Sequence, residues 1–320
     1  MSDNVNARTL RRLFPTRSAV LRDVLATAEK VLNHDVNVLI LGESGVGKDY
    51  LAEALHRCGN RAENKFVRID CANIPPDIFE SELFGYERGA FTDAQTRKVG
   101  RMELAHRGTL YLDEVGALTP PLQAKLLRVV QERKFSRLGG NQVLDIDARF
   151  LSSSNIPLDE LLESGLFRKD LFYRLNVITL TIPPLRQRRS DIPELAAKFL
   201  DETARHLKKR LRGFDEAVVD LLTDHSWPGN LRELRHVIER AAILEEGEVI
   251  TQASLPFENF VDASHFVASG LEQRWTLEEL EKRYIREILR QTSGNYSKTA
   301  NILGINRKTL LEKRKRYELD

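Results

Sequence analysis

The sequence predicts an α/β fold with a parallel sheet, followed by a helical region and a small all-α unit. Three observations support this prediction. A glycine-rich loop lies between a short apolar run at 36–41 and a segment of helical spacing at 49–57. Further apolar runs alternate with helical segments, as in sheets built from strand-helix-strand units. Near the C-terminus, two short helical segments are broken at Gly304, which is the pattern of a helix-turn-helix.

The composition limits the classes of protein. The chain has 320 residues, too long for one compact domain, so two or three are expected. Its 49 basic and 47 acidic residues nearly balance, so the net charge of +2 indicates no partner. Cys58 and Cys71 have neither a metal-ligand spacing nor a disulfide framework, and we expect buried thiols in a reducing compartment. No apolar run reaches membrane-spanning length and no signal segment is present, so a cytoplasmic protein without a membrane partner is expected.

Apolar spacing places the elements in order along the chain. It predicts helices at 18–32, 49–57 and 121–132 and strands at 36–41, 66–70, 108–112 and 148–153. Helical stripes return between 190 and 246. These stripes predict a helical core without chemistry of its own.

The glycine-rich loop has the composition of a phosphate-binding loop. Its glycines let successive backbone N–H groups surround a triphosphate, and Lys48 brings a positive charge to the outer phosphates. A turn that binds nothing is the alternative, but the full spacing between a strand and an amphipathic helix favours nucleotide binding. Asp49 stands where Ser or Thr is usual, so Mg²⁺ must rely on another carboxylate. The residues expected to bind the nucleotide are Gly42, Glu43, Ser44, Gly45, Val46, Gly47, Lys48 and Asp49.

Two acidic residues, Asp113 and Glu114, follow the apolar run at 108–112. If this strand lies beside the one before the loop, Asp113 can hold Mg²⁺ and Glu114 can polarise a water for attack on the γ-phosphate. A solvated helix cap is the alternative, and the Lys48 loop favours the catalytic interpretation. Asn155, after the strand at 148–153, is a candidate for contact with the γ-phosphate or its water, although such an Asn is more often a turn residue.

The segment 84–94 has small residues around Phe91 and no helical or strand periodicity, which alone indicates a surface turn. It resembles the GAFTGA loop of bacterial enhancer-binding proteins, the AAA+ ATPases that activate sigma-54 RNA polymerase. The resemblance extends from about residue 14 to 317 and includes several motifs in the expected order. It implies ATP and Mg²⁺ as cofactors and a contact of Phe91 and Thr92 with sigma-54 RNA polymerase.

The resemblance assigns roles to the other motifs. Arg168 and Arg174 resemble arginine fingers that reach the ATP of a neighbouring subunit, although two arginines at this spacing would otherwise indicate a solvated helix face. This implies a homo-oligomer, from a dimer to a hexameric ring, with shared active sites. By the same similarity, the loop is the Walker A motif, the Walker B acids are Asp113 and Glu114, sensor I is Asn155, and sensor II is Arg232.

Two positions depart from the family pattern. Asp93 replaces the second Gly of the GAFTGA loop and adds a negative charge, so contact with sigma-54 is expected to be altered. Asp70 replaces an Asn that hydrogen-bonds the Walker B Glu, and it would repel Glu114 instead. Both favour the alternative function, a DNA-binding regulator in which ATP sets the oligomeric state and sigma-54 is not remodelled.

The C-terminal segment has the charge of a DNA-binding element. Between residues 296 and 316 there are seven basic residues and one acidic residue. A helical hairpin with a solvated basic face is the alternative, and the turn at Gly304 with a cap at Asn306 favours a helix-turn-helix. The segment resembles the Fis-type domain of the same family, which implies dimeric binding to two-fold symmetric upstream DNA. The residues expected to contact DNA are Lys298, Arg307, Lys308 and Thr309.

These motifs predict four parts: an AAA+ nucleotide-binding subdomain at 1–185, a helical lid at 186–253, a linker at 254–272 and a Fis-type domain at 273–320. The predicted function is a sigma-54-dependent regulator that binds upstream DNA and hydrolyses ATP to remodel the polymerase. Family members often carry a sensing domain before the ATPase. Only a short tail precedes it here, so control by a trans-acting regulator, by protein level or by a small ligand is expected.

Overall fold

The computed structural model describes residues 10–92, 94–255, 274–292 and 295–317. Two compact units are present, Met1–Leu255 and Pro256–Asp320. Asp93 and most of the predicted linker, 256–272, lie outside the described residues. Within the described ranges, no helix is long and apolar enough to cross a membrane.

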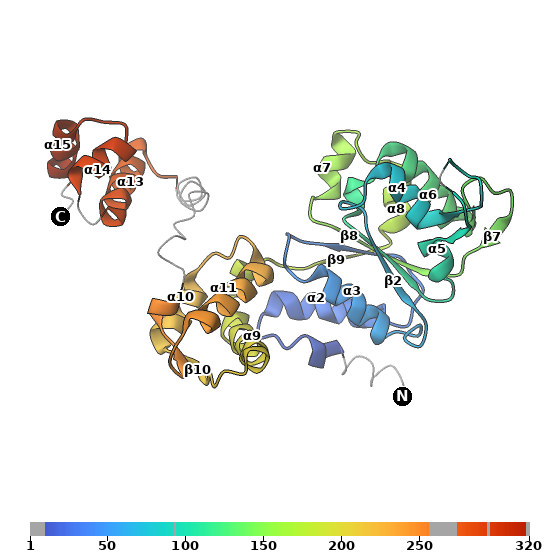
Figure 1. Ribbon diagram of the computed structural model, residues 1–320, viewed down its shortest axis with the longest axis horizontal. Helices are drawn as coiled ribbons and strands as arrows, with labels where there is room; N and C mark the ends of the chain where they lie inside the picture. The colour runs from blue at the N-terminus through green and yellow to red at the C-terminus, as the bar shows by residue number, and fades with distance from the viewer. Residues whose placement is uncertain (1–9, 93, 256–273, 293–294, 318–320) are drawn as a thin grey trace. The chain divides into compact units, whose positions relative to one another are not determined.

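The first unit contains a five-stranded sheet in the order β2-β5-β8-β1-β9, with all neighbours parallel (Figure 1). The strands are β1 (Val38–Leu41), β2 (Phe66–Asp70), β5 (Thr109–Asp113), β8 (Arg149–Ser154) and β9 (Ile178–Thr181). The prediction of a parallel α/β sheet is therefore confirmed. Because parallel strands end at the same edge, the loops after β1, β5 and β8 meet there.

Helices cover both faces of the sheet (Figure 1). The alternating side chains of β1 enter two separate cores, since Val38 and Ile40 pack on one face and Leu39 on the other. The first core includes α2 (Ala19–Lys30) and α3 (Lys48–Arg57). The second core is formed by α4 (Pro76–Phe84), α5 (Arg101–Leu104), α6 (Pro120–Glu132), α7 (Leu158–Glu163) and α8 (Lys169–Leu175). Cys58 and Cys71 are buried free thiols, as predicted.

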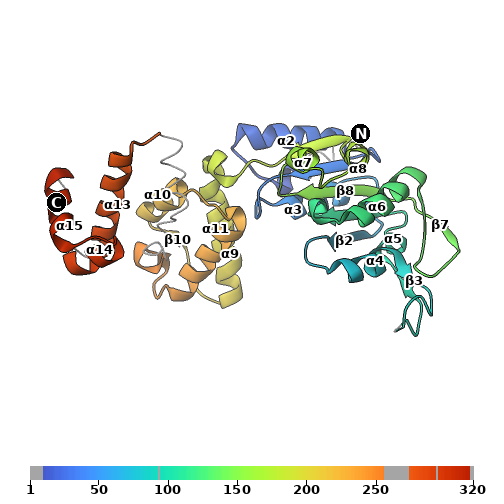
Figure 2. The same cartoon turned by 90° about the horizontal axis from the view of Figure 1, so that it is seen from above.

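A short hairpin stands where no regular structure was expected. Antiparallel strands β3 (Gly85–Tyr86) and β4 (Lys98–Val99) enclose the Phe91 segment, and the hairpin extends beyond α4 in Figure 2. Gly85 has a φ of 75°, and a Cβ there would lie 2.4 Å from the Lys98 carbonyl oxygen, so the close pairing requires glycine. A second hairpin, β6 (Lys134–Ser136) with β7 (Val143–Asp145), lies beside the first through a bridge from Tyr86 to Leu138.

The lid follows β9. It contains α9 (Ile192–Leu207), α10 (Glu216–Asp224) and α11 (Asn230–Leu244), with short parallel strands β10 (Gly213–Phe214) and β11 (Val249–Ile250). Among the described residues of the first unit there are also single turns of 3-10 helix: η1 (Val115–Ala117), η2 (Leu185–Gln187), η3 (Arg189–Asp191) and η4 (Gln252–Ser254). Trp227 is fully buried in the lid, and its Nε1 donates to the Leu222 carbonyl oxygen at 2.7 Å.

The described residues of the second unit form the helices α13 (Leu277–Gln291), α14 (Tyr296–Ile302) and α15 (Arg307–Tyr317). Its small core contains Ile285, Ala300, Leu310 and Tyr317. Gly304 takes a φ of 65° in the turn between α14 and α15, a conformation that favours glycine. The predicted helix-turn-helix is confirmed.

Candidate functional site

The loop after β1 has the backbone that a phosphate requires. Gly45 and Gly47 have φ values of 77° and 106°, in the left-handed region. A Cβ on Gly45 would lie 2.4 Å from the Gly229 carbonyl oxygen of the lid, so only glycine lets the two segments approach this closely. The loop leads into the N-terminus of α3, where backbone N–H groups favour an anion.

Lys48 is buried at the start of α3, with 6% of its side chain exposed. Its ammonium donates to the carbonyl oxygens of Gly42 at 2.9 Å and Glu43 at 3.3 Å. It also lies 3.1 Å from Glu114 Oε1. The structure thus joins the predicted phosphate-binding lysine to the acid after β5.

Strand β8 orients both acids at the end of β5, Asp113 as its last residue and Glu114 directly after it. Ser153 donates its hydroxyl to Asp113 Oδ1 at 2.6 Å and accepts the Glu114 backbone N–H at 3.0 Å. Burial pushes the pKa of Asp113 upward, but the Ser153 hydrogen bond and the Arg68 charge outweigh burial, and the pKa lies below its ordinary value. Asn155 contacts Glu114 Oε2 through its backbone N–H at 2.8 Å. The backbone N–H of Asn155, and not its side-chain amide, makes this contact.

Two residues of the site, Arg68 and Tyr111, were missed by the sequence reasoning. The Tyr111 hydroxyl lies 2.9 Å from Asp49 Oδ1 and 3.1 Å from Asp113 Oδ1. Arg68 pairs with Asp49 Oδ2 at 2.8 Å and also with Asp113 Oδ2. Burial and the two carboxylates raise the pKa of Tyr111, so its phenol stays protonated and donates. The available signal was the strand period, which places Arg68 and Asp70 on one side of β2.

The donor set of this corner suits Mg²⁺. The described residues contain no group of three or more His, Cys, Asp or Glu arranged to hold a metal. Mg²⁺ usually binds one or two carboxylates together with substrate phosphates, rather than an all-protein cage. Asp113 and Asp49 are two such carboxylates, and they are held against the same hydroxyl.

The lid contacts the loop directly. Arg232 donates to the Ser44 hydroxyl at 2.9 Å, and the Leu231 N–H donates to the Gly45 carbonyl oxygen at 3.0 Å. Asn230, which is buried, donates its amide to the Ser44 carbonyl oxygen and to Glu43 Oε2, both at 3.1 Å. Rotation of the lid would therefore break or move the hydrogen bonds that the lid makes to the loop.

A cavity of about 410 Å³ lies beside the loop, between its Val46 and the lid. Apolar side chains form much of its wall, including Phe14, Ile182, Leu195, Phe199 and Leu231. A cavity with largely apolar walls beside the loop suits the base of a nucleotide whose phosphates enter the loop.

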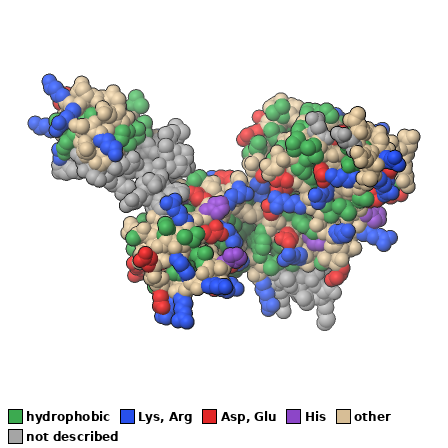
Figure 3. Space-filling model, in the orientation of Figure 1, with side chains coloured by type: hydrophobic (Ala, Val, Ile, Leu, Met, Phe, Trp, Pro, Cys, Tyr) green, Lys and Arg blue, Asp and Glu red, His purple; other side chains and the backbone are tan. Residues whose placement is uncertain are grey.

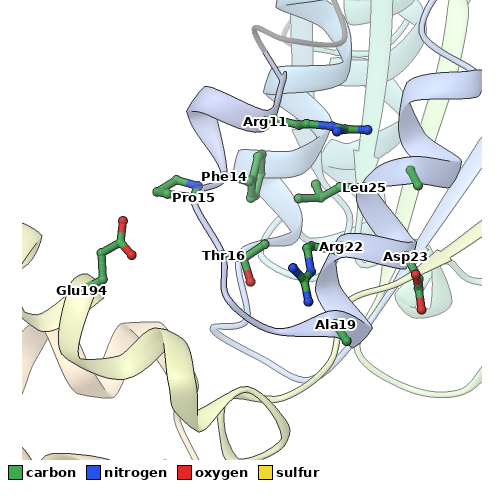
Figure 4. A pocket seen from close by; sticks show the side chains of 10 residues that line it. Arg11, Phe14, Pro15, Thr16, Ala19, Arg22, Asp23, Leu25 and Glu194 are labelled. Atoms are coloured by element: carbon green, nitrogen blue, oxygen red, sulfur yellow. The ribbon is translucent and has the colours of Figure 1, made fainter.

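A second cavity, of about 720 Å³, is lined by the segment 14–16 and by residues of α2 (Figure 4). Its wall includes the charged side chains Arg11, Arg22, Asp23 and Glu194. Buried Asp191 anchors this segment to the lid, since it accepts from the Thr16 hydroxyl at 2.6 Å. Charged side chains line both cavities, but the wall of this one is less apolar, which makes it less suited to a base.

The predicted arginine fingers lie on the surface. Arg168 precedes α8, is 47% exposed, and pairs with Asp170 at 2.8 Å. Arg174 lies in the last turn of α8 and is exposed. Asp70 is engaged by its own turn, since its two carboxylate oxygens accept from Asn73 Nδ2 at 2.7 Å and from the Ala72 N–H at 3.0 Å.

Phe91 and Thr92 are both exposed in the β3–β4 hairpin, and Asp93 lies outside the described residues. The Phe91 ring packs edge-on against Tyr86 with centroids 4.9 Å apart. Below the hairpin, buried Arg137 donates to Glu87 at 2.7 Å and to Glu103 at 2.6 Å. This ion-pair cluster fixes the base of the hairpin.

The basic surface of the second unit is smaller than the sequence count implied. Lys and Arg side chains project from this unit in Figure 3. Lys298, Arg307 and Lys308 are exposed. Lys313 and Arg316 instead pair with Glu281 and Glu278 of α13, at 2.6 and 2.8 Å. The Thr309 hydroxyl is donated to the cap residue Asn306 at 3.0 Å.

Three family models match the chain. A model of the sigma-54 interaction domain matches residues 14–181. Models of the AAA+ ATPase lid domain and of bacterial regulatory proteins of the Fis family match 186–267 and 276–317. The chain belongs to the bacterial enhancer-binding protein family. It is a sigma-54-dependent transcriptional activator with a Fis-type DNA-binding domain.

Relatives in this family match most of the chain. The regulatory protein AtoC of Escherichia coli K12 is 43% identical over 95% of this chain and 68% of its own length. The transcriptional regulatory protein ZraR of Klebsiella oxytoca is 44% identical over 92% of this chain and 67% of its own length. The crystal structure of NtrX from Brucella abortus in complex with ATP has a TM-score of 0.70 at 36% identity, over 94% of this chain and 68% of that one.

Proposed function

We propose that this activator hydrolyses ATP with Mg²⁺ at sites shared between subunits of a ring in the cytoplasm, and that hydrolysis moves the Phe91 hairpin against sigma-54. One observation carries the proposal. Lys48, at the start of α3, is paired at 3.1 Å with Glu114, which follows β5, and Arg232 of the lid contacts Ser44 of the same loop. A phosphate-binding cation, a candidate base and a movable lid are thus in one place.

The residues of the chain divide the chemistry among them. The loop N–H groups and Lys48 bind the phosphates, and the cavity beside Val46 takes the base. Glu114, oriented by Ser153 and the Asn155 N–H, accepts a proton from the attacking water. Asp113 and Asp49 would hold Mg²⁺, which neutralises phosphate charge when bound.

Arg168 and Arg174 complete the site of a neighbouring subunit in this proposal. Their exposure leaves both guanidinium groups accessible from outside the chain. Arg168 must first exchange its Asp170 partner for a phosphate, a change that a charge-assisted bidentate contact can offset.

The DNA-binding part of the proposal rests on the second unit. Arg307 and Lys308 begin α15 beside the cap at Asn306, so they reach DNA first if this helix enters the major groove. Lys298 on α14 is placed to contact phosphate. A two-fold symmetric site with half-sites about one helical turn apart is expected for a dimer.

Mixing inactive variants tests the shared site. Lys48→Ala and Arg174→Ala should each lose ATPase activity, as should Glu114→Gln. An equal mixture of Lys48→Ala and Arg174→Ala should recover about a quarter of the parent rate, because a random ring places an intact loop against an intact arginine at that frequency. Variants that assemble with the parent protein yet recover nothing when mixed would place both residues in the same subunit's site.

A further inference from the structure

Arg68 lies at the proposed nucleotide site, but none of the family motifs includes it. It lies in the middle of the edge strand β2, opposite Tyr111 in the register with β5. One guanidinium nitrogen contacts both Asp49 Oδ2 and Asp113 Oδ2. The side chain is 45% exposed, with its guanidinium carbon 5.9 Å from the centre of the Tyr111 ring.

The two carboxylates form a closed arrangement with this arginine. Each gives one oxygen to the Tyr111 hydroxyl, at 2.9 and 3.1 Å, and the other to Arg68. Two carboxylates that share a single hydroxyl repel each other unless a cation compensates them. Arg68 supplies that cation from within the protein.

We propose that Arg68 is a positioning residue that holds Asp49 and Asp113 together and competes with Mg²⁺ for their oxygens. The inference rests on the proposed nucleotide site. Its consequence is that nucleotide binding depends less on Mg²⁺ in this chain than it would without the arginine.

The charge of Arg68 explains the behaviour expected without Mg²⁺ and with it. Without Mg²⁺, Arg68 neutralises carboxylates that would otherwise repel the phosphates of a nucleotide. With Mg²⁺, the same guanidinium repels the ion and occupies its ligands, so it must move toward solvent before the ion can bind. The partial exposure of Arg68 and its long flexible stem allow this movement.

The test measures binding of a ribose-labelled fluorescent ADP to the full chain, in EDTA and across a Mg²⁺ titration. For Arg68→Ser, the ratio of the Kd in EDTA to the Kd in saturating Mg²⁺ should rise about five- to tenfold over the parent, as expected for losing one charge beside a divalent ion. The Mg²⁺ concentration at which half of the increase in ADP affinity is reached should fall as well. Arg68→Lys keeps the positive charge but lacks the two-pronged guanidinium, so its ratio should lie between those of the parent and Arg68→Ser.

Arg128→Ser is the matched control. Arg128 is 80% exposed on α6 and pairs with Glu132 of its own helix at 3.5 Å, so its removal should leave the ratio unchanged. If Arg68→Ser unfolds, Arg68→Gln carries the test with the same expected result. A ratio that is unchanged or lower while the parent binds ADP would overturn the role of Arg68 alone. No binding by the parent at any Mg²⁺ concentration would overturn the proposed function and this inference with it.

Discussion

Ser153 links the strand beside the phosphate-binding loop to both acids of the site, and its removal is the sharpest perturbation available. Its side chain is fully buried in β8. The hydroxyl donates to ionised Asp113 and accepts from the Glu114 N–H. Ser153→Ala therefore removes one charge-assisted hydrogen bond and leaves a backbone donor without its acceptor.

The expected cost can be worked from these two contacts. A hydrogen bond to a charged group contributes about 1.5–3 kcal/mol, and a buried donor left unsatisfied costs about 1–3 kcal/mol. Because Glu114 is 22% exposed and water can reach part of the site, we expect Ser153→Ala to lower the free energy of unfolding by about 2–4 kcal/mol. ATP hydrolysis should fall much more than ADP affinity, since the loop itself is unchanged.

The neighbouring serine is the control. Ser152 is equally buried, but its hydroxyl has no hydrogen-bond partner in the part of the chain that the structure describes. Ser152→Ala should change the free energy of unfolding by less than about 1 kcal/mol, in either direction. Urea unfolding followed by circular dichroism compares the pair. Equal losses in the two variants would refute the role given to the Ser153 hydrogen bonds.

Three further predictions concern other parts of the chain. The hydroxyl of Ser254 and two backbone N–H groups lower the pKa of Glu245 to about 2. The stability that ionised Glu245 adds to the fold is therefore present above the ordinary pKa of a glutamate and is lost as the pH falls toward 2. Glu245→Gln should lower the free energy of unfolding by about 1–3 kcal/mol at pH 7. The difference from the parent in urea unfolding should shrink between pH 5 and 2, and a constant difference would argue against an ionised Glu245. Arg137→Met should lower the free energy of unfolding by about 1–3 kcal/mol, because the acidic partners of Arg137 are only partly exposed. Proteolysis within 85–99 should also become faster. An unchanged cleavage rate would mean that these ion pairs do not fix the hairpin. Lys308→Ala should weaken binding to all DNA sequences and reduce the slope of log affinity against log salt by about 1. A loss of affinity for one sequence alone would instead assign Lys308 to base recognition.

Local features of the site could be predicted from the sequence. The loop around Lys48, the acids after β5 and the cap at Asn306 depend on residues close together in the chain, where spacing and backbone preference are sufficient. The parallel sheet followed from alternating strand and helix signals. These are the parts in which short-range physics determines the structure.

Features that depend on register between distant segments could not be predicted. Arg68 meets Asp49 and Asp113 only because β2 pairs with β5 in one register, which a single sequence does not specify. The pairing of Arg316 with Glu278 likewise depends on how α13 packs against α15. The β3–β4 hairpin has two-residue strands, too short to give a period.

Open-complex formation tests the central claim most directly. Sigma-54 RNA polymerase on a sigma-54 promoter should form heparin-resistant open complexes with the parent protein and ATP. No such complexes should form with Glu114→Gln, which is expected to bind ATP without hydrolysing it, or with Phe91→Ala, which leaves the residues of the proposed ATPase site unchanged. A parent protein that hydrolyses ATP but opens no promoter would contradict the coupling of this site to sigma-54, and recovery of opening by Asp93→Gly would locate the defect in the hairpin.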